Sequence, residues 1–137
     1  MPLLLDTDYA ELKERGLVFT EDEARRFLVL SGYPLPDGLY HQKSCDVLVI
    51  IPGNYNQGGI DMLWTHPRPT RIDGRAIPAV MELGSPYNHH FDGKEFCRWS
   101  RHWTTAPVLW RAGTDNVVTI LRRIEWALNN PDPGVKK

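Results

Sequence analysis

The sequence predicts an α+β domain in which helices pack on an antiparallel sheet. Three observations lead to this class. A helix-like segment lies near the N-terminus, three strand-like segments follow one another with only turns between them, and a periodic helical segment lies near the C-terminus. Because no helix separates the predicted strands, a parallel sheet of the Rossmann kind is not expected.

The N-terminal third is predicted to form a short helix and then a strand. The helix covers Asp6 to Gly16, with Asp6 or Thr7 as its N-cap and the glycine as its stop. The strand begins within "FTEDEARRFLVL" and includes at least Arg26 to Leu30. The run "GYPLPDG" ends this strand, because its two prolines cannot continue a central ladder.

The strongest strand signal is "SCDVLVIIP", Ser44 to Pro52, which is rich in valine and isoleucine and ends at a proline. Its apolar residues are continuous from Val47 to Ile51, which indicates burial on both faces. After the turn "GNYNQGG", a third strand is predicted over Ile60 to Trp64, and "THPRP" ends it.

A long loop is predicted from Arg71 to Phe91, with one short strand around Ile77 to Met81. Glycine and proline recur throughout this stretch and periodicity is weak. Loops of this length inside a compact domain are uncommon and are often functional. "KEFCRWS" then forms a short strand that runs into a turn.

The C-terminal helix, about Asn116 to Asn129, has the clearest pattern in the chain. Asp115 or Thr114 is the expected cap, and Pro131 lies beyond the end. Five apolar residues recur at helical spacing and should face the core: Val117, Ile120, Leu121, Ile124 and Leu128. The outer face is expected to hold Arg122, Arg123 and Glu125.

Size and composition narrow the class of protein. The 137 residues are expected to form one domain, residues 1–137, with its core over about 25–133. The net charge of −1 argues against non-specific nucleic-acid binding, which relies on a basic surplus. No apolar run approaches the ~20 residues needed to span a membrane, so a cytoplasmic protein is expected. Cys45 and Cys97 are expected to be free thiols.

The stretch "FCRWSRHW", residues 96–103, concentrates reactive groups. Cys97 lies beside Arg98 and His102, and nearby cations lower the pKa of a thiol. Ser100 is a competing nucleophile that would need a base. Cys45, by contrast, lies in the strongest strand and is interpreted as packing.

Neither a metal nor a cofactor is expected. The histidines of "YNHHFDG", together with Cys97 and His102, do not have the spacing of a zinc site. Trp99 and Trp103 belong either to the core or to a face that docks another protein, where Trp and Arg are enriched.

In its order of motifs the chain resembles the ubiquitin-conjugating enzyme fold. The motifs are "VIIPGNYNQGGIDMLW", then "HP", then "DGKEFCRW", then the helix ending "NNPDP". More closely, "GYPLPDG", "DMLWTHP", "WSRHW" and "WRAGTDN" resemble a bacterial family of that superfamily, encoded beside ubiquitin-like and activating-enzyme-like proteins. The resemblance covers most of Leu28 to Pro133 and implies a UBC-like fold.

The resemblance implies a conjugating enzyme in a bacterial ubiquitination-like pathway, with antiphage defence as its family-level role. An activating enzyme would supply a ubiquitin-like protein, and an acceptor protein would receive it at an amine. Cys97 matches the acceptor cysteine and is preferred by position, forming a thioester. In the family pattern "WSRH" varies less than the position of Cys97, which favours Ser100 as the acceptor; Ser100 would form an oxyester. His66-Pro67 matches a His-Pro motif, while Arg68 replaces the Asn that stabilises the oxyanion.

The predicted catalytic set is therefore Cys97, Ser100, Arg101 and His102. Arg98 and Arg101 would stabilise the oxyanion, and His102 would assist proton transfer. The alternative is a non-catalytic adaptor of the same fold that docks a ubiquitin-like protein or its activating enzyme. The presence of two candidate nucleophiles favours the enzyme.

Overall fold

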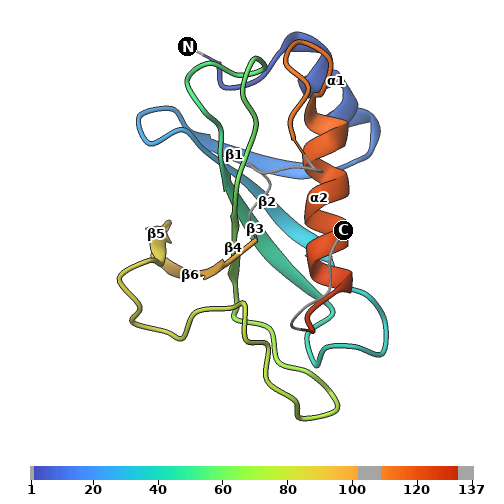
Figure 1. Ribbon diagram of the computed structural model, residues 1–137, viewed down its shortest axis with the longest axis vertical. Helices are drawn as coiled ribbons and strands as arrows, with labels where there is room; N and C mark the ends of the chain where they lie inside the picture. The colour runs from blue at the N-terminus through green and yellow to red at the C-terminus, as the bar shows by residue number, and fades with distance from the viewer. Residues whose placement is uncertain (1, 102–108, 133–137) are drawn as a thin grey trace.

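A computed structural model describes residues 2–101 and 109–132, and within them two helices and six strands (Figure 1). The helices are α1 (Asp6–Glu14) and α2 (Val117–Asn129). The strands are β1 (Val18–Asp22), β2 (Phe27–Pro34), β3 (Ser44–Ile50), β4 (Leu63–His66), β5 (His89–Phe91) and β6 (Lys94–Trp99). The predicted α+β class is confirmed.

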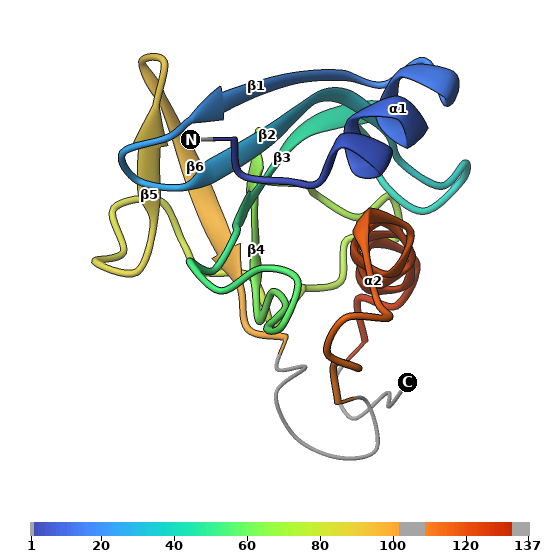
Figure 2. The ribbon, with the colours of Figure 1, turned by 90° about the horizontal axis from the view of Figure 1, so that it is seen from above.

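The strands form one antiparallel sheet in the order β1-β2-β3-β4-β6-β5. The sheet curls, so that β1 and β5 lie at its two ends and α2 lies against one face (Figure 2). Most of the buried core lies between that face and the two helices. A smaller apolar cluster on the other face includes Phe27, Trp64 and Phe96.

The prediction for β3 is confirmed. Val47, Leu48 and Val49 are all fully buried, because the sheet is covered on both faces at this strand. The third predicted strand is shifted along the chain: β4 begins at Leu63 and runs through Thr65 to His66. Thr65 lies inside the sheet despite its polarity, since its hydroxyl accepts a hydrogen bond from the Trp99 indole at 2.9 Å.

Two strands were not predicted, and both are at the ends of the sheet. β1 has the polar sequence "VFTED", and β5 lies inside the predicted loop from Arg71 to Phe91. An edge strand needs few apolar residues, so periodicity does not reveal it. The strand predicted around Ile77 to Met81 is reduced to one antiparallel bridge between Val80 and Trp99.

The C-terminal helix buries all five predicted apolar residues, which confirms its orientation. Arg123 is a correction, because this predicted outer-face residue is 2% exposed and donates to the Ile60 carbonyl at 3.2 Å. The cap is Asn116, whose side chain accepts from the Val118 amide. Asp115 does not cap the helix and instead accepts hydrogen bonds from Arg111 and Thr119.

Helix α1 is confirmed, but neither predicted cap is used. The helix begins after Leu5, whose amide donates to Asp8 in the first turn. The buried Asp8 carboxylate also accepts from the Tyr55 hydroxyl at 2.7 Å and from the Val117 amide at 3.1 Å. One carboxylate therefore joins the start of α1, the turn after β3 and the first residue of α2. Neither helix is long and apolar enough to cross a bilayer.

Candidate functional site

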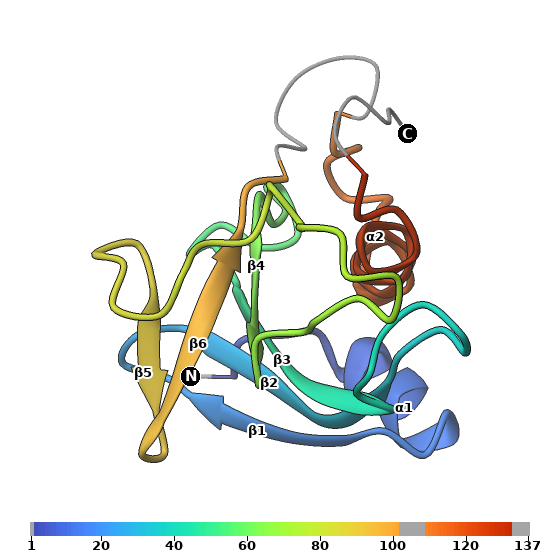
Figure 3. The ribbon, with the colours of Figure 1, turned by 90° about the horizontal axis from the view of Figure 1, so that it is seen from below.

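The predicted nucleophiles lie on β6 and just beyond its end (Figure 3). Cys97 is within the strand, and Ser100 and Arg101 follow its last residue. His102 and Trp103 lie outside the described residues. Strand β4 pairs with one edge of β6 over Cys97 to Trp99.

Cys97 is part of the main core and is fully buried. Burial raises the pKa of its thiol, and the neighbouring carboxylate of Glu95 acts in the same direction. The prediction of a lowered pKa is therefore wrong, because burial dominates and outweighs the opposing effect of the Arg68 cation. The other cysteine, Cys45, behaves as predicted for a packing residue: it is buried, and burial raises its pKa to about 12.

Ser100 is half-buried and is the middle residue of a tight turn. Its own amide donates to the Ala79 carbonyl at 2.8 Å, and the next amide, that of Arg101, donates back to the Trp99 carbonyl at 2.9 Å. A three-residue turn of this kind is common at strand ends. Its backbone is therefore fixed on both sides while its side chain is at the apex of the turn.

Residues 79–82 form a short segment that runs along the last residues of β6. Val80 makes the bridge to Trp99, and the Met81 amide donates to the Arg98 carbonyl at 2.9 Å. This segment lies on the edge of β6 that β5 occupies at the other end of the strand. The sequence predicts a short strand around Ile77 to Met81 within the long loop, but it gives these residues no role in the site.

Asn88 fills the gap between this segment and β5. Its side-chain oxygen accepts from the Arg98 amide at 3.1 Å, and its nitrogen donates to the Glu82 carbonyl at 2.9 Å and the Glu95 carboxylate at 2.8 Å. The same nitrogen lies 3.7 Å from the Cys97 sulfur. Asn88 belongs to the stretch "YNHHFDG", whose residue types raise only the question of a metal site.

Arg101 is directed toward the end of α2. Its guanidinium donates to the Asn130 carbonyl at 2.6 Å and lies over the Trp126 ring, 5.7 Å from its centre. Burial lowers the pKa of this group. Its contacts therefore connect the candidate site to α2.

Arg98 has a different environment. It lies one residue after Cys97 on β6, so its side chain points to the opposite side of the strand. Its guanidinium lies over the exposed ring of Tyr87, 4.1 Å from the ring centre. The Arg98 Nε atom is buried without a hydrogen-bond partner among the residues that the structure describes.

The His-Pro-Arg stretch begins at the last residue of β4, and its arginine reaches the segment 79–82. His66 Nδ1 lies 3.0 Å from the Glu95 carbonyl. Arg68 donates to two successive carbonyls, from Nε to Met81 at 3.0 Å and from Nη2 to Val80 at 3.3 Å. It therefore contacts the segment 79–82 that pairs with β6.

His89 and His90 are successive residues of β5, so their side chains point to opposite faces of the strand. His89 packs against the Phe27 and Trp64 rings, at centre distances of 5.1 and 4.8 Å, whereas His90 is exposed. Over residues 2–101 and 109–132, no three His, Cys, Asp or Glu side chains are grouped to hold a metal ion.

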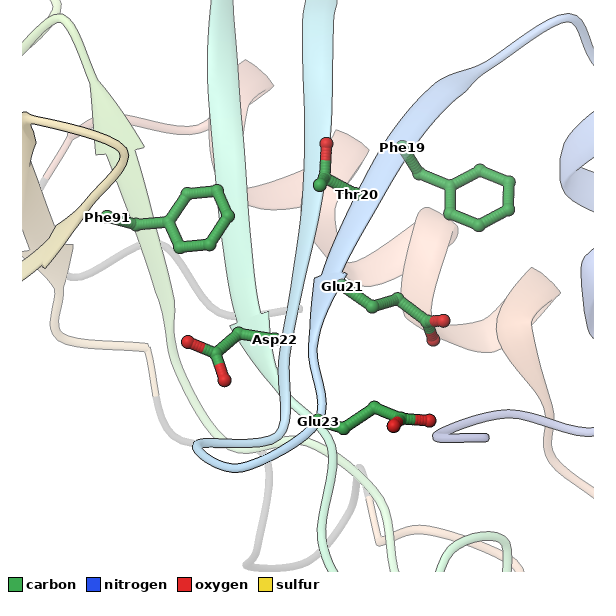
Figure 4. A pocket seen from close by; sticks show the side chains of 6 residues that line it. All are labelled: Phe19, Thr20, Glu21, Asp22, Glu23 and Phe91. Atoms are coloured by element: carbon green, nitrogen blue, oxygen red, sulfur yellow. The ribbon is translucent and has the colours of Figure 1, made fainter. Parts of the chain in front are cut away.

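A hollow of about 700 Å³ lies between the two ends of the sheet, lined by residues 19–23 and Phe91 (Figure 4). Thr20 and Asp22 lie on the side toward Phe91, while Phe19 and Glu21 point away from it. Phe91 pairs with the first residue of β6, whereas Ser100 follows the last one. The hollow and the candidate chemistry are therefore at opposite ends of this strand.

A curled antiparallel sheet with α2 on one face, and with the candidate nucleophiles at the end of β6, defines a protein of the ubiquitin-conjugating-enzyme-like class. The chain belongs to prokaryotic E2 family E, whose family model matches residues 4–131. No curated protein and no solved structure matched the chain. Family membership gives the protein an E2-like conjugating role in general.

Proposed function

We propose that this chain carries the C-terminal carboxyl group of a ubiquitin-like protein as an ester on Ser100 and passes it to an amine of an acceptor protein. Membership of the E2 family supports the conjugating role. The observation that carries the choice of residue is the contrast between a half-buried Ser100 at the apex of a turn and a fully buried Cys97.

The proposed donor is a thioester between the ubiquitin-like protein and an activating enzyme. In the first transfer, Ser100 Oγ attacks the carbonyl carbon, so that a C–O bond forms and the C–S bond breaks. The thiolate remains on the activating enzyme and the serine proton passes to a base. In the second transfer, the acceptor amine attacks the ester, a C–N bond forms, the C–O bond breaks, and Ser100 regains a proton.

Cys97 is the less suitable acceptor in this geometry. A thiol is the better nucleophile only as the thiolate, and burial raises the pKa of Cys97. An acyl group on its sulfur would also have to fit among Trp99, Leu63 and the other core residues, which are fully buried. Interiors packed at this density have no room for an added chain.

We assign proposed roles to two neighbouring groups, His102 from its place in the sequence and Arg98 from its contacts. Ser100 needs a base, and His102, two residues further on, is the candidate that the sequence provides. Arg98 is the proposed cation for the oxyanion, because its guanidinium has a ring contact and no ion pair among the described residues. Arg101 is not proposed for this task, since it donates to Asn130.

The test replaces Ser100 so that the proposed oxyester is either removed or converted to a thioester. The protein is incubated with its cognate activating enzyme, the ubiquitin-like protein and ATP, and the adduct is followed by a gel shift. The wild-type adduct should survive thiol reductants and be cleaved by hydroxylamine. Ser100→Ala should form no adduct, whereas Ser100→Cys should form one that reductants cleave, because a thioester replaces the oxyester.

Cys97→Ala is the decisive comparison, with Cys45→Ala as a control for loss of an equally buried thiol. Both should form the wild-type adduct. A reductant-sensitive wild-type adduct that disappears in Cys97→Ala would assign the ester to the cysteine instead. Absence of an adduct in every arm would support the adaptor alternative.

A further inference from the structure

We propose that Arg68 is a positioning residue that holds Ser100 in place through the segment 79–82. The inference deepens the proposed function and rests on it, since Ser100 is the residue to be held. Arg68 occupies the place after His66-Pro67 where the superfamily resemblance leads one to expect an oxyanion-stabilising Asn. In this protein the Arg68 side chain instead donates hydrogen bonds to backbone carbonyls of the segment 79–82.

The Arg68 guanidinium is directed at backbone carbonyls. Nε donates to Met81 and Nη2 donates to Val80, so one planar group binds two successive peptide units. A third and weaker contact reaches the Glu82 carboxylate at 3.4 Å, which is 85% exposed. The side chain of Arg68 is itself only 23% exposed, so these bonds are partly shielded from water.

One peptide unit that Arg68 binds, between Val80 and Met81, also pairs with β6, and the adjacent unit, between Ala79 and Val80, holds the end of that strand. Met81 donates to the Arg98 carbonyl, and the Ala79 carbonyl accepts the Ser100 amide. Two links therefore connect Arg68 to Ser100, namely the guanidinium on residues 80–81 and the ladder between residues 79–81 and 98–100. No direct contact between the two side chains is needed.

The segment is also held by the Val80 side chain, which is buried in the main core, but among the described residues no other group donates to the carbonyls of Val80 and Met81. The turn before the segment has one backbone bond, from Val80 to Ile77, and Asn88 binds only its last residue, Glu82. Residues 82–84 are exposed. Without Arg68, the carbonyls of Val80 and Met81 would turn to water, and the segment would keep its buried Val80 side chain but lose the group that fixes the orientation of these two peptide units.

Only an arginine can make this arrangement, because its donors form a rigid fork while a lysine is a single flexible point charge. Arg68→Lys therefore retains the charge and loses the fork. A misplacement of the reacting group by about 1 Å can cost ~100-fold in rate. We expect Arg68→Ala and Arg68→Lys both to lower the rate constant of transfer onto Ser100 by roughly 10- to 100-fold.

The KM for the loaded activating enzyme should change little, because Arg68 acts on Ser100 and not on the donor. The matched control is Arg75→Ala. Arg75 is an exposed arginine of the same loop whose side chain binds Asp132, and its replacement should leave the rate unchanged. Full activity of Arg68→Lys would contradict the proposal, since charge alone would then suffice.

A second measurement does not depend on catalysis. Amide hydrogen exchange at Ser100 and Met81 should become roughly 10-fold faster in both Arg68 variants, while the amides of β3 retain their protection. Unchanged exchange at Ser100 would overturn the inference. If exchange accelerates but Ser100→Ala still forms the adduct, Arg68 does position this residue and the proposed function is wrong.

Discussion

At the residue scale, the absence of a side chain at Gly59 leaves room for the ring of Trp110, which lies between the turn after β3 and α2. The indole of Trp110 lies against the Gly59 backbone, and a Cβ at this position would overlap the ring. The indole nitrogen donates to the Asn56 carbonyl at 2.9 Å, and Arg123 of α2 lies over the same ring. Trp110 is thus fixed between the turn after β3 and the helix.

Gly59→Ala is therefore expected to destabilise the protein by about 1–3 kcal/mol, the cost typical of overpacking. The control is Gly53→Ala in the same turn, because a Cβ there meets no atom within 4 Å and the residue has no left-handed conformation. Urea unfolding of the two variants measures the difference. Equal stabilities would mean that Trp110 moves aside freely.

At the element scale, α2 supplies the largest apolar contribution from a single helix. Its five predicted residues, together with Ala127, enter the main core. Leu121 is 3% exposed, so its truncation would leave a cavity beneath the helix.

Leu121→Ala should lower the free energy of unfolding by about 2–5 kcal/mol. Arg122→Ala is the neighbouring control on the exposed face and should change stability by no more than about 0.5 kcal/mol. Thermal unfolding followed by circular dichroism is sufficient to compare them. A Leu121→Ala protein as stable as the control would contradict the packing of α2.

The same elements show what sequence reasoning can and cannot reach. α2 and β3 were predicted because periodicity and continuous apolarity are local properties of the chain. β1 and β5 were missed because polar edge strands are defined by their partners. The strand that contains Cys97 was predicted correctly, but the burial of its thiol depends on β4 and the helices. The pKa of the thiol was therefore predicted in the wrong direction, and the contacts that Asn88 and Arg68 make with residues 80–82 had no local signal in the sequence.

At the scale of the whole molecule, the long loop between β4 and β5 is tied to the end of α2. Arg71, whose side chain is 5% exposed, binds Asp73 at 2.7 Å and Asp132 at 2.6 Å. Arg101 joins the candidate site to the same end of the helix through Asn130. The loop, the end of β6 and the end of α2 therefore form one connected region around Ser100.

Ionised carboxylates hold several contacts elsewhere in the fold as well as at Asp73, and these contacts lower the pKa values of the carboxyl groups. Asp73 accepts from the Arg75 amide and from Arg71, and Glu95 accepts from Asn88 and the Gly84 amide. Burial acts against ionisation of Asp115, but hydrogen bonds from Arg111 and Thr119 outweigh it and lower its pKa. His89 also has a lowered pKa, because burial and then the nearby Arg25 disfavour its charged form.

These shifts all predict a protein that loses stability in acid. For each group the unfolded chain binds the proton more tightly, so stability falls as pH decreases through the interval between the unfolded and folded pKa. The His89 contribution should decline below its ordinary pKa of 6.5, and the carboxylate contributions below ordinary values of 3.8 to 4.5. Urea unfolding from pH 8 to pH 3 should therefore show two successive decreases in the free energy of unfolding.

The variant His89→Phe should remove the first decrease and keep the second, because the new ring still packs between Phe27 and Trp64 but cannot be protonated. A stability that is constant or rises between pH 7 and pH 5 in the unmodified protein would contradict the assignment to His89.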